Sequence, residues 1–162
     1  MTKEELQDII KSHEMWLNCG TGKRADLSGA NLSGAYLIGA DLSELVYNED
    51  TAFYALQCPE EGSFIGYKKA HVYIIKLEIL ADAKRSSATS HKCRCSAAKV
   101  LSITTVDGSE EVKEIASDRD SNFIYRVGEI VRVDNFDEDR WNECSTGIHF
   151  FITRREAEQY EA

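Results

Sequence analysis

The sequence contains a single proline, and no apolar run reaches the roughly 18 residues that a membrane-spanning helix needs. The scarcity of proline argues against a disordered linker, and the missing apolar run argues against a membrane span. Positive charge is also scarce, because 19 Lys and Arg stand against 28 Asp and Glu, which gives a net charge of −9. An acidic chain of this kind is not expected to attract nucleic acid through its overall charge.

Cysteine is present in an odd number, which does not suit a framework of disulfides; the five are Cys19, Cys58, Cys93, Cys95 and Cys144. The first ten residues are acidic and amphipathic, unlike a secretory signal. We therefore expect a cytoplasmic protein with reduced thiols. A zinc site built from His91, Cys93, Cys95, Cys144 and His149 is considered and rejected, because the cysteine spacing lacks a zinc knuckle. No metal and no cofactor are predicted.

The stretch from Ala25 to Glu44 consists of four five-residue units, ADLSG, ANLSG, AYLIG and ADLSE. Alanine holds the first position of every unit and leucine the third, and glycine closes the first three units. A period of five fits neither an α-helix nor a β-strand, and self-similarity at a fixed period is typical of a coiling repeat.

These units resemble the pentapeptide-repeat family, whose motif is A(D/N)LXX; Tyr36 is the one departure at the second position. The resemblance implies a right-handed square β-helix, of which four units make one coil. One coil cannot bury its own apolar faces, so it needs a cap at each end or a second subunit. We expect the preceding helix to be one cap, and we predict a homo-oligomer.

Local patterns predict a helix at each end of the chain. Thr2 and Glu5 form a capping-box pair before an amphipathic stretch that ends near Asn18 to Gly22, and Thr153 and Glu156 form a second pair. Between them, β-branched runs predict strands within 71–80, 99–106, 122–137 and 148–153. The polar stretch 81–98 contains no strand pattern, and 111–118 is ambiguous between strand and helix.

We place residues 1–57 in a module of capping helix and repeat coil, and residues 58–162 in a β-rich ligand-binding domain. The predicted fold class is therefore α+β, mainly β. The second part resembles an uncharacterised domain that follows pentapeptide repeats in many phage and some bacterial proteins. The segments that carry the resemblance are 62–70, 82–101 and 136–160. It implies the architecture and a phage setting, but no chemistry.

Basic and hydroxyl side chains concentrate between residues 84 and 94, which favours an anion site. The candidate ligands to phosphate are Lys84, Arg85, Ser86, Ser87, Lys92 and Arg94. No P-loop glycine pattern accompanies them. The alternative is a solvated loop with scattered charges.

A second group, Trp141, Asn142 and His149, could stack on a base and contact its edge. The alternative is that Trp141 packs on the core and that His149 is a hydrogen-bonded strand residue. Catalysis by Cys144 or Ser145 with His149 is conceivable, but no orienting carboxylate is marked.

These patterns predict a non-enzymatic protein that binds a small anionic ligand, for which a nucleotide-derived signal is the best candidate. In a phage, such a protein would act as an anti-defence sponge, which removes a signalling molecule of the host. Two alternatives stay open. One is a protein-interaction module or a DNA-mimic inhibitor, to which the net negative charge points. The other is a nucleotide-processing enzyme.

Overall fold

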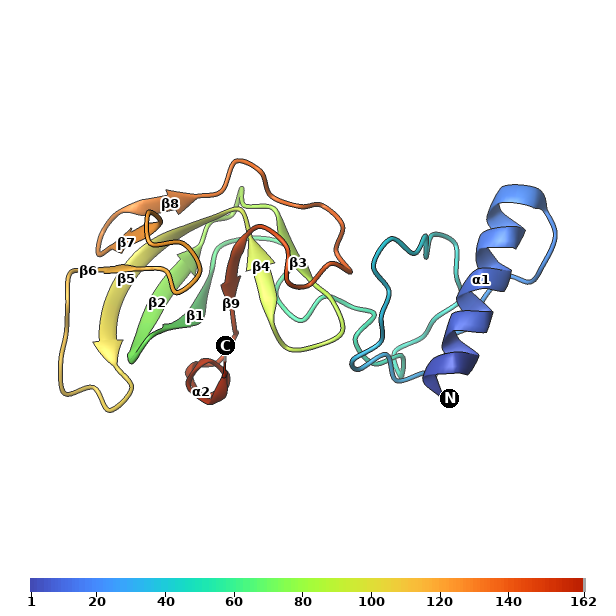
Figure 1. Cartoon of the computed structure of the whole chain (residues 1–162), viewed down its shortest axis with the longest axis horizontal. Helices are drawn as coiled ribbons and strands as arrows, with labels where there is room; N and C mark the ends of the chain where they lie inside the picture. The colour runs from blue at the N-terminus through green and yellow to red at the C-terminus, as the bar shows by residue number, and fades with distance from the viewer. Residues whose placement is uncertain (162) are drawn as a thin grey trace.

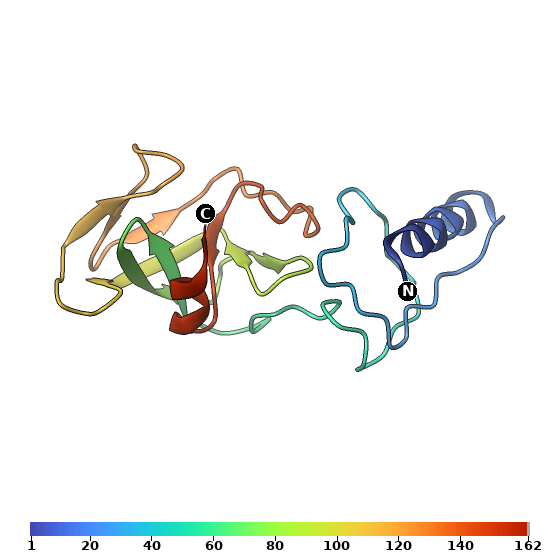
Figure 2. The same ribbon diagram turned by 60° about the horizontal axis from the view of Figure 1, so that its bottom comes forward.

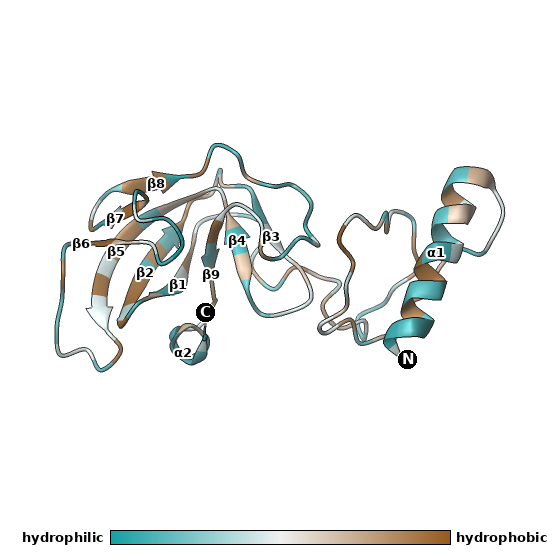
Figure 3. Cartoon of the chain, in the orientation of Figure 1, coloured by the Kyte–Doolittle hydropathy of each residue, from teal (hydrophilic) through white to brown (hydrophobic). Residues whose placement is uncertain are grey.

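A computed structural model describes residues 1–161. The molecule is elongated, with helix α1 (Lys3–Cys19) at one end, the repeat segment 25–53 in the middle and the β-sheets at the other end (Figures 1 and 2). Figure 3 shows hydrophobic colouring on strand β2 (Tyr73–Ile79) and on the middle of α1. Among residues 1–161, no helix is both long and apolar enough to cross a membrane.

Helix α1 begins and ends where its sequence predicts. Thr2 and Glu5 form the reciprocal capping box, and Gly20 closes the helix in the left-handed conformation (φ 65°). One face packs against the repeat segment through Leu6, Ile10 and His13. The fully buried His13 accepts a hydrogen bond from the Ala25 amide at Nδ1 (3.1 Å) and donates from Nε2 to the Ser43 carbonyl (2.9 Å). The helix is thus fixed to both ends of the four repeat units.

The repeat segment buries its leucines inward and forms isolated parallel bridges instead of strands. Leu32 and Leu37 are almost completely buried. Asp26 bridges Val46 and Asn31 bridges Ala52, so the chain returns beside itself after the four units. Leu27 donates to the Val46 carbonyl at 2.8 Å within this pairing.

Within the described residues, the rest of the chain forms three antiparallel sheets with no closed barrel. Their strand orders are β1-β2-β5-β8, β3-β4-β9 and β6-β7. Beside β2, the strands are β1 (Phe64–Ala70), β3 (Arg85–Ser87), β4 (Cys93–Cys95), β5 (Ala97–Thr105), β6 (Glu114–Ala116), β7 (Ile124–Arg126), β8 (Ile130–Arg132) and β9 (Ile148–Phe150). Helix α2 (Arg154–Gln159) follows the Thr153 capping box. The prediction of a mainly β chain with a helix near each end is confirmed.

The polar stretch 81–98 was expected to lack strands, and this expectation is wrong. It contains β3 and β4, which pair with each other and, through β4, with β9. Cys93, Arg94 and Cys95 of β4 are all almost fully buried. A central strand that is covered on both sides shows no alternation in hydrophobicity, so periodicity could not reveal it.

The β-rich domain covers the end of the repeat segment that α1 leaves open. The Gly34 amide donates to the Thr89 carbonyl (3.1 Å), and the Gly39 amide donates to Asp139 Oδ2 (3.0 Å). Trp141 and Tyr54 pack against the repeat leucines. Both ends are therefore capped within one chain, and coverage by a second subunit is not required.

Candidate functional site

An open groove of about 570 Å³ lies where the segment that leaves the repeats meets β3 and the loop after β8. We call it the groove. Its lining residues are Leu56, Glu60, Ala83, Lys84, Arg85, Ser86, Phe136, Glu138 and Arg140. The groove is shallow and open to solvent. The lining combines cations, carboxylates, one hydroxyl and apolar walls.

Two cations of the groove keep hydrogen-bonding capacity for a ligand. Lys84 is exposed and pairs only with the exposed Glu138. Arg140 donates from Nε to the Ser87 carbonyl (2.7 Å) and from Nη2 to the Phe53 carbonyl (3.2 Å), whereas Nη1 has no partner among residues 1–161. Burial lowers the pKa of Arg140, although Tyr54 and Glu60 raise it. The guanidinium remains a cation at neutral pH.

The Ser86 hydroxyl has no partner. Among residues 1–161, its Oγ is the only buried side-chain nitrogen or oxygen without a hydrogen bond. The residue is 4% exposed and lines the groove. Native proteins pair nearly all buried polar groups, because an unpaired one costs roughly 1–3 kcal/mol. The Ser86 hydroxyl, which is itself covered from solvent, therefore has unused hydrogen-bonding capacity beside the groove.

Arg85 lines the groove, but its guanidinium is fully used by the protein. Nε donates to the Ala83 carbonyl, Nη1 to Pro59 and Gly62, and Nη2 to Leu80 and Ala81. The group also lies over the Phe64 ring at 5.1 Å. Arg85 therefore connects the backbone segments 59–62 and 80–83 beside the groove, and it has no N–H group left for an anion.

Arg94 is buried and does not line the groove, although its guanidinium lies 4.9 Å from the ring centroid of the lining residue Phe136. Arg94 is 1% exposed and donates to the backbone carbonyls of Asp137 (3.0 Å), Thr146 (2.6 Å) and Asp139 (3.0 Å). Burial lowers the pKa of its guanidinium, while Asp137 and Asp139 oppose this shift. Its role in this structure is to hold the 136–146 loop against β4.

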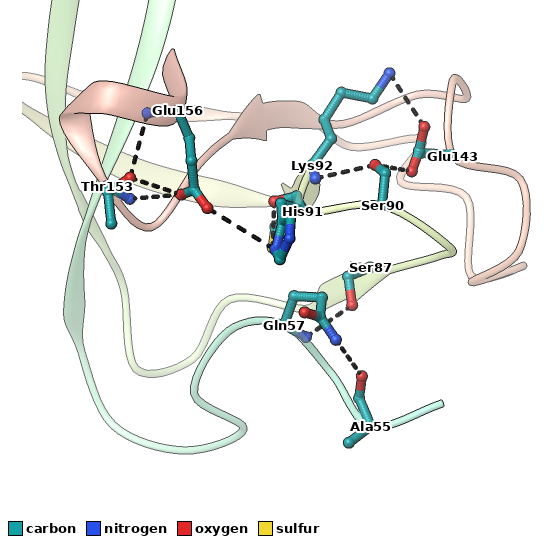
Figure 4. A network of polar contacts seen from close by, with 10 residues as sticks. Ala55, Gln57, Ser87, Ser90, His91, Lys92, Glu143, Thr153 and Glu156 are labelled. Carbon is teal, nitrogen blue, oxygen red and sulfur yellow. Dashed lines mark hydrogen bonds and ion pairs between the residues drawn. The ribbon is translucent and has the colours of Figure 1, made fainter. Parts of the chain in front are cut away.

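Lys92 belongs to a separate polar network (Figure 4). Its ammonium lies 3.6 Å from Glu143 Oε2 and 3.4 Å from Cys144 Sγ, and Ser90 donates to the same Glu143. Burial acts to lower the pKa of Lys92, but Tyr160, Glu143 and Cys144 together raise it. Lys92 is thus a buried partner of Glu143 and does not face the groove.

The other predicted site residues support the fold. Trp141 packs on the repeat leucines, with the Arg140 guanidinium 4.2 Å from its ring centroid. Asn142 Nδ2 donates to Asp137 Oδ2 (3.0 Å). Ser87 Oγ accepts from the Gln57 amide (2.9 Å; Figure 4). These side chains hold the loops around the groove without lining it.

His149 lies in β9 and donates from Nε2 to the Glu143 carbonyl (3.0 Å). Burial lowers its pKa to about 4, and the nearby Lys92, Lys68 and Arg94 act in the same direction. The imidazole is therefore neutral at pH 7, although its hydrogen bond to the Glu143 carbonyl favours the charged form. Its position is separate from the groove.

All five cysteines are free thiols, and Cys58, Cys93 and Cys95 are buried. Within residues 1–161, no group of three or more His, Cys, Asp or Glu side chains is placed to hold a metal ion. The cysteines of β4 are core residues of the domain.

Each of the two parts of the chain matches a known protein family. Residues 54–157 match a family of unknown function, DUF5758. The chain belongs to this family. Residues 23–45 match the pentapeptide repeats. No curated protein and no solved structure matches the chain.

Every residue that lines the groove lies within the DUF5758 domain. Of the site residues predicted from the sequence, the consecutive Lys84, Arg85 and Ser86 line the groove. Sequence reasoning missed Glu60, Phe136 and Arg140, which come from two distant segments. No local pattern in the sequence pointed to these residues.

Proposed function

We propose that this protein is a non-enzymatic binding protein that captures an anionic, nucleotide-derived ligand in the groove of its DUF5758 domain. The unpaired Ser86 hydroxyl, in a groove that also contains Lys84 and Arg140, carries the proposal. A phosphate would accept hydrogen bonds from Lys84 Nζ and Arg140 Nη1, and the flat base would lie against Leu56 and Phe136.

In this proposal, the repeat segment serves the domain as a platform. We propose that it is a single right-handed β-helix coil, supported by its parallel bridges and inward leucines. The contacts of Arg140 to the Phe53 carbonyl and the Trp141 ring hold this platform against the groove. The setting that we propose is phage infection, in which capture of a host signalling nucleotide would suppress defence; the resemblance to phage proteins supports it.

Replacing Ser86 by Ala should raise the stability of the ligand-free protein and weaken ligand binding. Removal of an unpaired buried hydroxyl should increase the free energy of unfolding by about 1 kcal/mol. Loss of one hydrogen bond to the ligand should weaken affinity about tenfold. Urea unfolding measures the first effect, and isothermal titration calorimetry with inorganic phosphate and a nucleotide panel measures the second.

Ser87→Ala is the matched control. Ser87 is equally buried, but its hydroxyl accepts a hydrogen bond from the Gln57 amide. Its removal should destabilise the protein by about 1 kcal/mol, because the amide loses its partner. If both variants lose stability to the same extent and bind as wild type does, Ser86 has no role in binding.

A further inference from the structure

The groove contains carboxylates as well as cations, and these carboxylates limit which anionic ligands can bind. Glu60 and Glu138 both line it. Glu138 pairs with Lys84, whereas Glu60 has neither an ion pair nor a side-chain hydrogen bond to any of residues 1–161. An exposed carboxylate of this kind is an acceptor that is open to a donor on the ligand.

The donors that face a ligand are few. Arg85 uses all of its N–H groups on backbone carbonyls, so the cationic donors that are available within the groove are Lys84 Nζ and Arg140 Nη1, beside the Ser86 hydroxyl. Two cationic donors are sufficient to bind a single phosphate group. A triphosphate would bring additional negative charge toward Glu60 and Glu138, and like charges in contact oppose binding.

The Lys84–Glu138 pair does not prevent phosphate binding. Both side chains are mostly exposed, at 60% and 71%. An exposed pair contributes little to stability, so a phosphate can displace Glu138 from Lys84 at small cost. Glu60 and Arg140 both line the groove, and the negative charge of Glu60 raises the pKa of Arg140, yet among residues 1–161 the two form no ion pair. The space between them is where the ligand would lie.

We propose that the groove selects a nucleoside monophosphate whose base carries an exocyclic amino group. The phosphate binds Lys84 and Arg140, and the amino group donates to Glu60. This inference depends on the proposed function, because it names the ligand class of the same groove. It excludes nucleoside triphosphates and bases without a donor as preferred ligands.

Isothermal titration calorimetry on the full chain tests the inference. The probes are AMP, GMP and CMP, their triphosphates, and purine riboside 5′-monophosphate, which lacks an exocyclic amino group and any donor on its ring. At least one of the three amino-bearing monophosphates should bind about tenfold or more tightly than purine riboside monophosphate and than its own triphosphate.

Two variants separate the roles of the two charges. Glu60→Ala should abolish the preference for the amino group, because it removes the acceptor, whereas Glu61→Ala, at an exposed neighbour outside the groove, should keep it. Lys84→Gln should weaken all monophosphates to a similar degree.

Equal affinity for AMP, GMP, CMP and purine riboside monophosphate would overturn the inference and leave the proposed function standing. Tighter binding of the triphosphates than of the monophosphates would also overturn the inference without contradicting the proposed function. If none of these nucleotides binds, both the inference and the proposed function are wrong.

Discussion

Replacing Arg94 by Met should lower the free energy of unfolding by about 3 kcal/mol or more, the largest effect that we expect from a single side chain. Arg94 is 1% exposed, and its guanidinium donates to three backbone carbonyls of the 136–146 loop. Met keeps most of the volume but donates to none of them. Since unpaired buried carbonyls cost about 1–3 kcal/mol each, the loop should detach from β4. Urea unfolding followed by tryptophan fluorescence measures the loss, because Trp141 is in this loop.

Arg94→Lys should rescue little of this loss, since a point cation cannot reproduce the planar fork of guanidinium donors. Arg132→Met is the matched control. Arg132 is half exposed and makes one ion pair of 3.6 Å with Asp82, so its replacement should change stability by less than about 1 kcal/mol. Equal stability of the Arg94 and Arg132 variants would contradict the role that we give to Arg94.

Arg140→Lys should weaken ligand binding about tenfold or more and should also loosen the junction between the repeat segment and the DUF5758 domain. The arginine connects the Phe53 and Ser87 carbonyls and stacks on Trp141, and it lines the groove. A lysine keeps the charge but cannot make these contacts at once. The two effects therefore arise together from the loss of one side chain.

Hydrogen exchange distinguishes the junction from the repeat segment itself. The amides of Gly34 and Gly39 donate to the domain and should exchange faster in Arg140→Lys. The Leu27 amide, which donates to Val46 within the repeats, should keep its rate. Lys84→Gln should lose affinity without changing exchange at the junction. Unchanged exchange at Gly34 and Gly39 in Arg140→Lys would show that Arg140 does not hold the two parts together.

The features that sequence predicted well depend on residues close to one another in the chain. The two capping boxes need residues three positions apart, and the five-residue units repeat Ala and Leu at fixed spacing. The strand runs of β2 and β5 contain enough β-branched residues to be found by pattern. Such local signals do not depend on how the rest of the chain folds.

The roles of the cations could not be predicted, because they depend on which carbonyls the fold leaves unpaired. Arg85 and Arg94 looked like anion ligands, since spacing alone cannot tell a donor to a backbone carbonyl from a donor to phosphate. Lys92 was equally ambiguous, because its partner Glu143 is far away in the sequence. Arg85, Lys92 and Arg94 therefore have mainly a structural role.

The groove itself was only partly predictable. Lys84 and Ser86 fall within the basic segment, whereas Glu60 and Arg140 approach them from the linker and from the loop after β8. No local pattern joins these three segments. The unpaired state of the Ser86 hydroxyl, on which the proposal rests most, is a property of the folded chain alone.

The most direct test of the central claim is native mass spectrometry of the protein purified from cells, with Lys84→Glu as the comparison. We predict that the wild type retains a small anionic molecule, which denaturation releases with its mass unchanged, and that Lys84→Glu is recovered without it. The same spectrum counts the subunits. If the wild type is empty and also remains empty after incubation with the nucleotide panel, capture of a nucleotide-derived ligand is contradicted.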